Sequence, residues 1–153
     1  MSYEDVVAVD TDVLAIHHFF TFDKRFKTNK TFLGNVVKRS TLGITIHNLL
    51  ELYGLATIAW GSEKAYELYR GYLRARNVAI LIPPYPTDWT HFTEKICKYL
   101  AKKMHYGDAL IAWAVDETRP SMFVTWNKKH FQNRMEVRVL TPEEFLKEHH
   151  SRR

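Results

Sequence analysis

The sequence has little cysteine and glycine, and it lacks any long hydrophobic run. Cys97 is the only cysteine, which excludes an intrachain disulfide and a zinc site built from several thiolates. The six glycines form no Gly-rich phosphate loop. The longest apolar run, Ala109 to Val115, is far shorter than the roughly 20 residues that cross a bilayer, and the acidic N-terminus leads into no signal-type apolar region. We therefore expect a soluble, cytoplasmic protein with no membrane partner.

The composition that remains is that of an ordinary globular domain. Of the 153 residues, 46% are hydrophobic, 14% aromatic and 25% charged. This length favours one domain, which we assign to residues 1–148, followed by a frayed basic tail at 149–153. The formal charge of +5 and the pI near 9.3 make a polyanionic partner plausible, although basicity alone does not identify one.

Short β-type runs alternate with segments whose apolar residues recur at helical spacing. The runs predict strands at 6–9, 42–45, 78–82, 122–125 and 137–140. Helices are predicted at 13–20, 46–58, 63–73, 88–104 and 109–117, with Ser62 and Asp108 as caps and a capping box at 141–144 opening the last helix. Residues 21–30 show no apolar period and are interpreted as a mobile connection or a frayed helix end. The alternation predicts an α/β fold of three layers, with a central, mostly parallel sheet of about five short strands flanked by helices.

Several oxygen-bearing side chains are delivered to one edge of this sheet. Asp10 follows the first strand, Thr125 and Asn127 follow the fourth, and Asp108 starts a helix. Glu51 lies on a neighbouring helix and completes the set. In parallel sheets the ligand site lies at the carboxyl ends of the strands. These residues are therefore the candidate site.

Carboxylates that converge repel one another unless a cation neutralises them. Hard oxygen ligands without cysteine select Mg²⁺ or Mn²⁺, and such ions promote phosphodiester hydrolysis. The sequence offers no convincing serine or cysteine nucleophile paired with a histidine base. Taken alone, each acid also has an ordinary interpretation: Asp12 and Asp108 as helix caps, and Glu51 as a solvated helix residue.

Four segments, in this order and spacing over nearly the whole chain, resemble the PIN-domain family, particularly the VapC toxins of toxin–antitoxin pairs. Residues 7–14 are similar to the family's opening strand and first acid, and residues 48–53 to its acidic helix. Residues 106–114 resemble the family's third and most distinctive segment, and residues 123–131 its fourth. The resemblance implies a PIN-like domain that cleaves RNA endonucleolytically, with one or two Mg²⁺ or Mn²⁺ ions held by Asp10, Glu51 and Asp108. It also implies a homodimer and a small antitoxin partner. The chain departs from the family at Asn127, where an aspartate is common, and the amide lowers the negative charge of the site.

Basic residues supply candidate RNA contacts. Lysines recur at helical spacing on the helix predicted after residue 88, others lie in and after the polar stretch, and one follows the fourth strand; they are Lys95, Lys98, Lys102, Lys24, Arg25, Lys27, Lys30, Lys38, Arg39 and Lys128. Such stripes are often only solvated helix faces. Trp126 and His130 are placed to stack on bases, and core packing is an equal alternative for the tryptophan.

Two other functions are compatible with the motifs. In a haloacid-dehalogenase-like phosphatase, Asp10 would be a covalent nucleophile and Asp12 a general acid. A PIN-like domain that binds RNA or a protein without cutting is the other alternative, and Asn127 is its only support.

Overall fold

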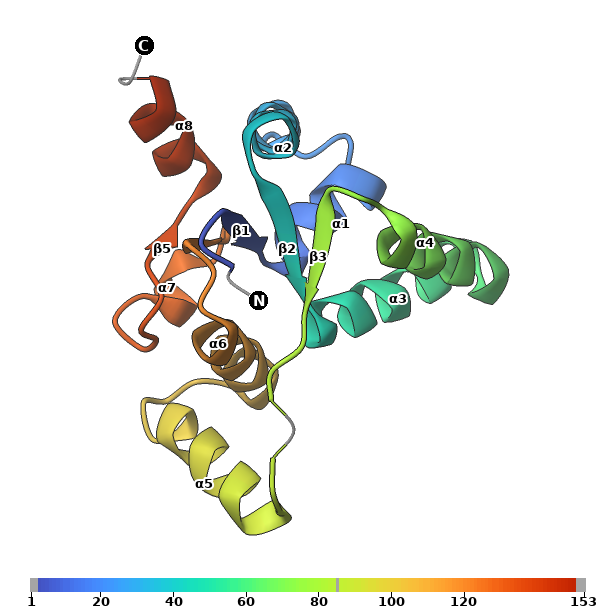
Figure 1. The fold of residues 1–153 in the computed structure, drawn as a ribbon. Coiled ribbons are helices and arrows are strands. Elements are labelled where there is room, and N and C mark those ends of the chain that lie inside the picture. The colour runs from blue at the N-terminus through green and yellow to red at the C-terminus, as the bar shows by residue number, and fades with distance from the viewer. Residues whose placement is uncertain (1–2, 85, 151–153) are drawn as a thin grey trace.

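The computed structural model describes residues 3–84 and 86–150. Five parallel strands form one sheet in the order β3-β2-β1-β4-β5 (Figure 1). The strands are β1 (Val6–Val9), β2 (Thr41–Thr45), β3 (Val78–Leu81), β4 (Met122–Val124) and β5 (Val139–Leu140). The helices of the described residues are α1 (Thr11–Phe19), α2 (Phe26–Arg39), α3 (Ile46–Trp60), α4 (Ser62–Arg74), α5 (Trp89–Leu100), α6 (Tyr106–Thr118), α7 (Lys128–Phe131) and α8 (Pro142–His150). The predicted α/β fold with about five short, parallel strands is confirmed.

The sheet is the middle of three layers because its strands bury both faces. In β1, Val7 and Val9 pack into a core with α1, α2, α3 and α8, whereas Val6 and Ala8 pack into a second core with α5, α6 and α7. Figure 1 shows α2 and α8 on one side of the sheet and α5 and α6 on the other. A run of four buried residues in β1 is typical of a parallel strand that is covered on both faces.

The interpretation of residues 21–30 as an irregular connection is wrong in its second half, because α2 begins at Phe26. The buried face of α2 consists of Asn29, Phe32, Leu33 and Val36, which is a regular helical spacing. Because the polar residue Asn29 occupies the first of these positions, the sequence shows no apolar period before Phe32. Asn29 is fully buried because its side chain donates to the Val13 carbonyl oxygen at 2.8 Å and accepts from the Trp126 indole.

Two predicted helix caps are also wrong. Gly61, with a φ of 90°, is the N-cap of α4 in place of Ser62, which is the first helical residue. Asp108 does not cap α6, because the helix begins at Tyr106 and places Asp108 in its first turn. The capping box of α8 is confirmed: the Thr141 amide donates to the Glu144 carboxylate at 2.9 Å, and the Glu144 amide donates to the Thr141 hydroxyl at 3.2 Å. Of the predicted tail, 149–150 end α8 and 151–153 lie outside the described residues.

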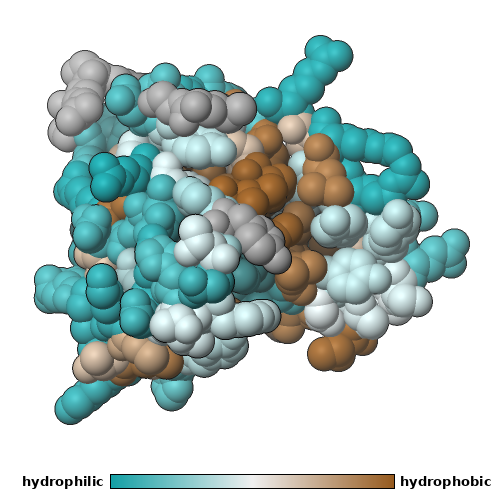
Figure 2. All heavy atoms as spheres, turned by 60° about the horizontal axis from the view of Figure 1, so that its bottom comes forward, coloured by the Kyte–Doolittle hydropathy of each residue, from teal (hydrophilic) through white to brown (hydrophobic). Residues whose placement is uncertain are grey.

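Some large hydrophobic side chains remain on the surface. Ile58, Ile82 and Trp89 are 86%, 63% and 80% exposed. On the face that Figure 2 brings forward, the largest hydrophobic area lies near the centre and borders hydrophilic surface, and smaller hydrophobic areas lie along the lower edge. Across residues 3–84 and 86–150, the helices are all too short or too polar to span a membrane.

Candidate active site

Three strand ends place the central polar residues side by side. Asp10 directly follows β1 and caps α1, Thr45 ends β2 and caps α3, and Thr125 directly follows β4. Strand β1 pairs with β2 on one side and β4 on the other, so these residues share the carboxyl edge of the sheet. The predicted location of the site at this edge is consistent with the topology.

Asp10 is the most firmly held of the acids. It is 7% exposed and accepts hydrogen bonds from the Thr11 amide at 2.8 Å, the Thr125 hydroxyl at 2.8 Å and the Asn48 side-chain amide at 3.1 Å. Burial raises the pKa of Asp10, and the negative charge of Asp108 raises it further, while the hydrogen bonds act in the opposite direction. The fold therefore fixes a carboxylate in a position where its charge is unfavourable.

A chain of hydrogen bonds connects Asp10 to Glu51. The Asn48 amide also donates to the Thr11 hydroxyl at 2.9 Å, which donates to Glu51 Oε1 at 3.1 Å. Asn48 is itself oriented by the Thr45 hydroxyl, which donates to its carbonyl oxygen at 2.6 Å. Asn48, Thr11 and Thr45 are positioning residues that the sequence analysis did not identify. The available signal was a buried polar residue, Asn48, between apolar positions of a helix.

Glu51 lies at the exposed rim of the site. Its carboxylate is partly desolvated, which raises its pKa, and the charges of Asp10 and Asp108 add to this effect. Asp10 and Glu51 are connected by this chain of hydrogen bonds, and the charge of Asp108 acts on both, so the fold brings the three predicted metal ligands into one neighbourhood.

Asp12 is a fourth acid at this edge, and the sequence suggested for it a helix cap or, in a phosphatase, a general acid, but not a metal ligand. Its Oδ2 accepts from the Trp126 amide at 3.0 Å and lies 3.3 Å from the Thr125 hydroxyl. Its Oδ1 is buried and has no hydrogen-bond partner within the described part of the chain. Burial, followed by the charge of Asp10, raises the pKa of Asp12 to about 7.

Asp108 and Asn127 complete the predicted set. Asp108 reaches the site from the first turn of α6, and one of its oxygens lies 3.1 Å from His130 Nδ1. Asn127 is exposed, and its backbone amide donates to the Thr125 hydroxyl at 3.0 Å. It lines a polar cavity of about 540 Å³, which is bounded by Trp126, Asn127, Lys128, Lys129, His130, Gln132, Thr141 and Glu144. This cavity adjoins the His130–Asp108 pair.

The acids share a neighbourhood without forming a closed ligand cage. Among residues 3–84 and 86–150, no group of three His, Cys, Asp or Glu side chains is arranged to hold a metal ion. Two of the acids have partners other than Asp10: Glu51 accepts from the Thr11 hydroxyl, and Asp108 contacts His130.

The predicted RNA contacts separate into two groups. Arg25 lies over the Trp126 ring and Lys128 lines the polar cavity, so both adjoin the acids. Lys128 also pairs with Glu144 at 2.9 Å, and Lys24 is exposed on the loop before α2. Lys95 on α5, in contrast, does not adjoin the acids.

Lys95 lies on α5 and has a partner away from the acidic edge, whereas Lys102 lies in the turn that follows α5. Lys95 pairs with Glu117 at 2.9 Å, nine residues beyond Asp108 on α6, which corresponds to about 13 Å along the helix axis. Lys102 donates to the Arg134 carbonyl oxygen at 3.1 Å, and Lys98 is exposed. The fold does not bring Lys95 to the candidate site.

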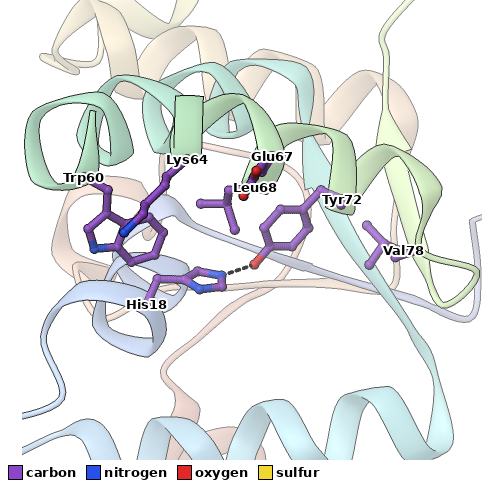
Figure 3. Close-up of a pocket in the computed structure, with 9 residues that line it drawn as sticks. His18, Trp60, Lys64, Glu67, Leu68, Tyr72 and Val78 are labelled. Carbon is purple, nitrogen blue, oxygen red and sulfur yellow. Dashed lines mark hydrogen bonds between the residues drawn. The ribbon is translucent and has the colours of Figure 1, made fainter. Parts of the chain in front are cut away.

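A larger cavity, of about 680 Å³, lies at the opposite end of the sheet (Figure 3). It is formed by the end of α1, by α4 and by Val78 at the start of β3. His18 Nε2 lies 2.6 Å from the Tyr72 hydroxyl, and Figure 3 shows Trp60 and Lys64 at the same opening. The cavity contains none of the acids at the carboxyl edge, so it is separate from the candidate active site.

No protein-family model matches the chain, and no curated protein is similar to it in sequence. Solved structures are similar in fold. VapBC2 from Rickettsia felis, bound to a promoter DNA fragment, is 17% identical with a TM-score of 0.63 over 89% of this chain and 98% of that one. A toxin–antitoxin complex from Klebsiella pneumoniae is 17% identical with a TM-score of 0.60, over 89% and 97%. VapC20 from Mycobacterium tuberculosis, described as a sarcin-ricin loop cleaving toxin, is 15% identical with a TM-score of 0.60, over 81% and 92%.

Proposed function

Because this chain has the PIN-domain fold of the VapC structures, we propose that it is a metal-dependent endoribonuclease and the toxin of a toxin–antitoxin pair. The observation that carries the proposal is the group of acids at the carboxyl edge of β1: hydrogen bonds through Asn48 and Thr11 connect Asp10 to Glu51, and the charge of Asp108 acts on both. Acids that only capped helices would not need to converge in this way.

The residues present fit a divalent cation. The donor set consists of hard carboxylate oxygens, and the buried Oδ1 of Asp12, which has no hydrogen-bond partner among the residues that the structure describes, is an oxygen available to a cation. Asp10, Glu51 and Asp108 would hold Mg²⁺ or Mn²⁺. Asp12 would supply a fourth carboxylate in place of the aspartate that is common in the family at the position of Asn127. When bound, the ion would polarise the scissile phosphoryl group and lower the pKa of a water nucleophile.

The other residues of the site position these groups and the RNA. Asn48 and Thr125 hold the Asp10 carboxylate in one orientation. Little reorganisation of Asp10 is therefore needed when charge develops on the reacting phosphate. The cavity beside Asn127 presents the amines of Lys128 and Lys129 to a polyanion. We propose that the RNA backbone crosses this cavity and places one phosphate next to Asp10 and Asp108.

The proposal includes partners and a compartment. The Klebsiella pneumoniae structure is a toxin–antitoxin complex, which supports a cognate antitoxin for this chain too. Homodimerisation and a cytoplasmic location, where RNA is accessible, belong to the same proposal. Exposed apolar residues such as Ile58 and Ile82 offer surface for such contacts.

One experiment separates this function from the two alternatives. The purified protein and its Asp10→Asn and Asp108→Asn variants are incubated with labelled structured RNA in Mn²⁺, Mg²⁺ or EDTA, and separately with p-nitrophenyl phosphate. The nuclease predicts cuts in metal that disappear in EDTA and in both variants. Hydrolysis of the phenyl phosphate with intact RNA would establish the phosphatase, and RNA binding without any cleavage would establish the non-cutting module.

A further inference from the structure

Arg25 and Trp126 form a stack next to the acids. The Arg25 guanidinium carbon lies 5.6 Å from the centroid of the Trp126 ring. Arg25 ends the loop between α1 and α2, whereas Trp126 directly follows Thr125, and its backbone amide donates to Asp12. The stack is therefore one residue removed from the side chains that hold Asp10.

Hydrogen bonds fix both planes of this stack. Asp23 accepts from Arg25 Nε and Nη2, each at 2.9 Å, and from the Arg25 backbone amide at 2.8 Å. On the other side, the Trp126 indole donates to the buried Asn29 side chain at 2.8 Å, and Asn29 donates to Val13 at the same distance. The orientation is thus built into the folded protein before any ligand binds.

The chemistry of the stack suits a nucleobase better than a phosphate. An arginine that clamps phosphate offers two parallel N–H groups, but Asp23 already occupies that edge of Arg25. Asp23 also compensates the positive charge. The Arg25 side chain is nevertheless 39% exposed, which leaves part of a planar, weakly hydrated guanidinium accessible. Planar guanidinium and aromatic groups are the surfaces on which unpaired RNA bases stack.

We propose that Arg25, supported by Trp126 and aligned by Asp23, is a stacking platform for one unpaired nucleobase beside the scissile phosphate. The proposal rests on the ribonuclease function proposed above and specifies it: the substrate is RNA that is single-stranded at that nucleotide. Phe22, in the same loop and fully exposed at 101%, offers a second aromatic surface nearby in sequence.

The test uses a short single-stranded RNA that the wild-type protein cuts at one bond, and copies with one abasic nucleotide at each position around that bond. Binding is measured with the Asp108→Asn protein, which we expect not to cut the RNA. We expect one abasic position to weaken binding on the order of 10-fold, as for the loss of one stacked base. Adding Arg25→Ala should weaken binding of the intact RNA equally and abolish the effect of that abasic position.

Matched variants separate stacking from charge. Arg25→Lys keeps the positive charge but loses the planar guanidinium, so its RNA binding should be as weak as that of Arg25→Ala. Wild-type binding by Arg25→Lys would overturn the proposal in favour of a phosphate contact. Lys24→Ala, at the exposed neighbouring cation, should lower affinity for every RNA alike.

Because Arg25→Ala removes a loop anchor, Asp23→Asn provides a second test. In this variant the same abasic position should weaken RNA binding less than it does with Asp23 present. If no RNA is cut by the wild type, the proposed function fails; if RNA is cut and Arg25→Ala still senses the abasic position, the platform alone fails.

Discussion

The side-chain amide of Asn48 donates to both Asp10, at 3.1 Å, and Thr11, at 2.9 Å, and thereby ties the first turn of α3 to the first turn of α1. Asn48 is fully buried, as is Thr45, whose hydroxyl donates to it. One amide therefore sets the orientation of Asp10 and, through Thr11, that of Glu51.

Asn48→Ala should damage both stability and activity. It removes a donor from the acceptor oxygens of Asp10 and Thr11 and leaves the buried Thr45 hydroxyl without its side-chain acceptor, so we expect the free energy of unfolding to fall by about 1–3 kcal/mol. Cleavage should fall more than binding of RNA. Denaturant titration and RNA cleavage measure the two effects. Asn35→Ala is the matched control, because Asn35 bonds only to the Thr31 carbonyl oxygen of its own helix; equal losses in both variants would contradict the role of Asn48.

Asp12 makes stability depend on pH. Its pKa is raised from 3.8 to about 7, so between these values the folded protein binds a proton that the unfolded chain has released. The free energy of unfolding must therefore fall as pH rises through that window. In EDTA, wild type should lose a few kcal/mol of stability between about pH 4 and 7. We expect Asp12→Asn to lack this decline and to be the more stable protein at pH 8.

This pH effect is read from the difference between wild type and variant. Burial lowers the pKa of His18 to about 4, so its titration raises stability with pH below its ordinary value of 6.5. That contribution is common to both proteins and cancels. Asp5→Asn, at an exposed acid, is the control. Melting curves with the same pH slope for wild type and Asp12→Asn would refute the assignment.

If Asp108 binds the proposed cation, its contact with His130 competes with that binding. The 3.1 Å contact is exposed on the His130 side, so its strength is modest. His130→Ala should therefore tighten Mn²⁺ binding by a small factor, on the order of 2 to 5-fold, corresponding to less than about 1 kcal/mol. Calorimetric titration with Mn²⁺ measures it, and His91→Ala on α5 serves as control. Weaker binding in His130→Ala would mean that His130 supports the ion instead of competing with it.

Gly43 is required by the close packing of β2 against its neighbours. A Cβ at this position would lie 2.5 Å from Val6 Cγ1 and 3.2 Å from Leu81 Cδ1. Gly43→Ala should cost about 1–3 kcal/mol of stability through overpacking. Gly34→Ala, within α2 and with nothing within 4 Å of the added atom, should stabilise by roughly 1 kcal/mol because alanine is the better helix former. Chemical denaturation of both variants checks the opposite signs.

Patterns with a strong local cause were predictable from the sequence. The strand at Val6–Val9 is a continuous β-branched and apolar run, and its end fixes Asp10 at the edge of the sheet. The capping box at Thr141 and Glu144 is a local pair of hydrogen bonds. In both cases neighbouring residues determine the outcome, so no knowledge of the rest of the fold is needed.

Features that depend on distant partners were missed. Asn29 can be buried in α2 because the indole N–H of Trp126, 97 residues away, donates to its side-chain oxygen. Asn48 and Asp12 likewise owe their positions to Asp10 and to the residues after β4. The start of α6 was misplaced because Asp108 resembles a cap, whereas its carboxylate contacts His130. Long-range polar contacts of this kind have no period in the sequence.

The central claim, that Asp10, Glu51 and Asp108 together bind a divalent cation, is tested most directly by calorimetric titration of Mn²⁺ into the wild-type protein, Asp108→Asn and Glu117→Gln. Glu117 lies on the same helix and pairs with Lys95, so it controls for the loss of one α6 carboxylate. The claim predicts saturable binding in wild type and Glu117→Gln that is lost in Asp108→Asn. Equal binding in all three proteins, or none in the wild type, would contradict it.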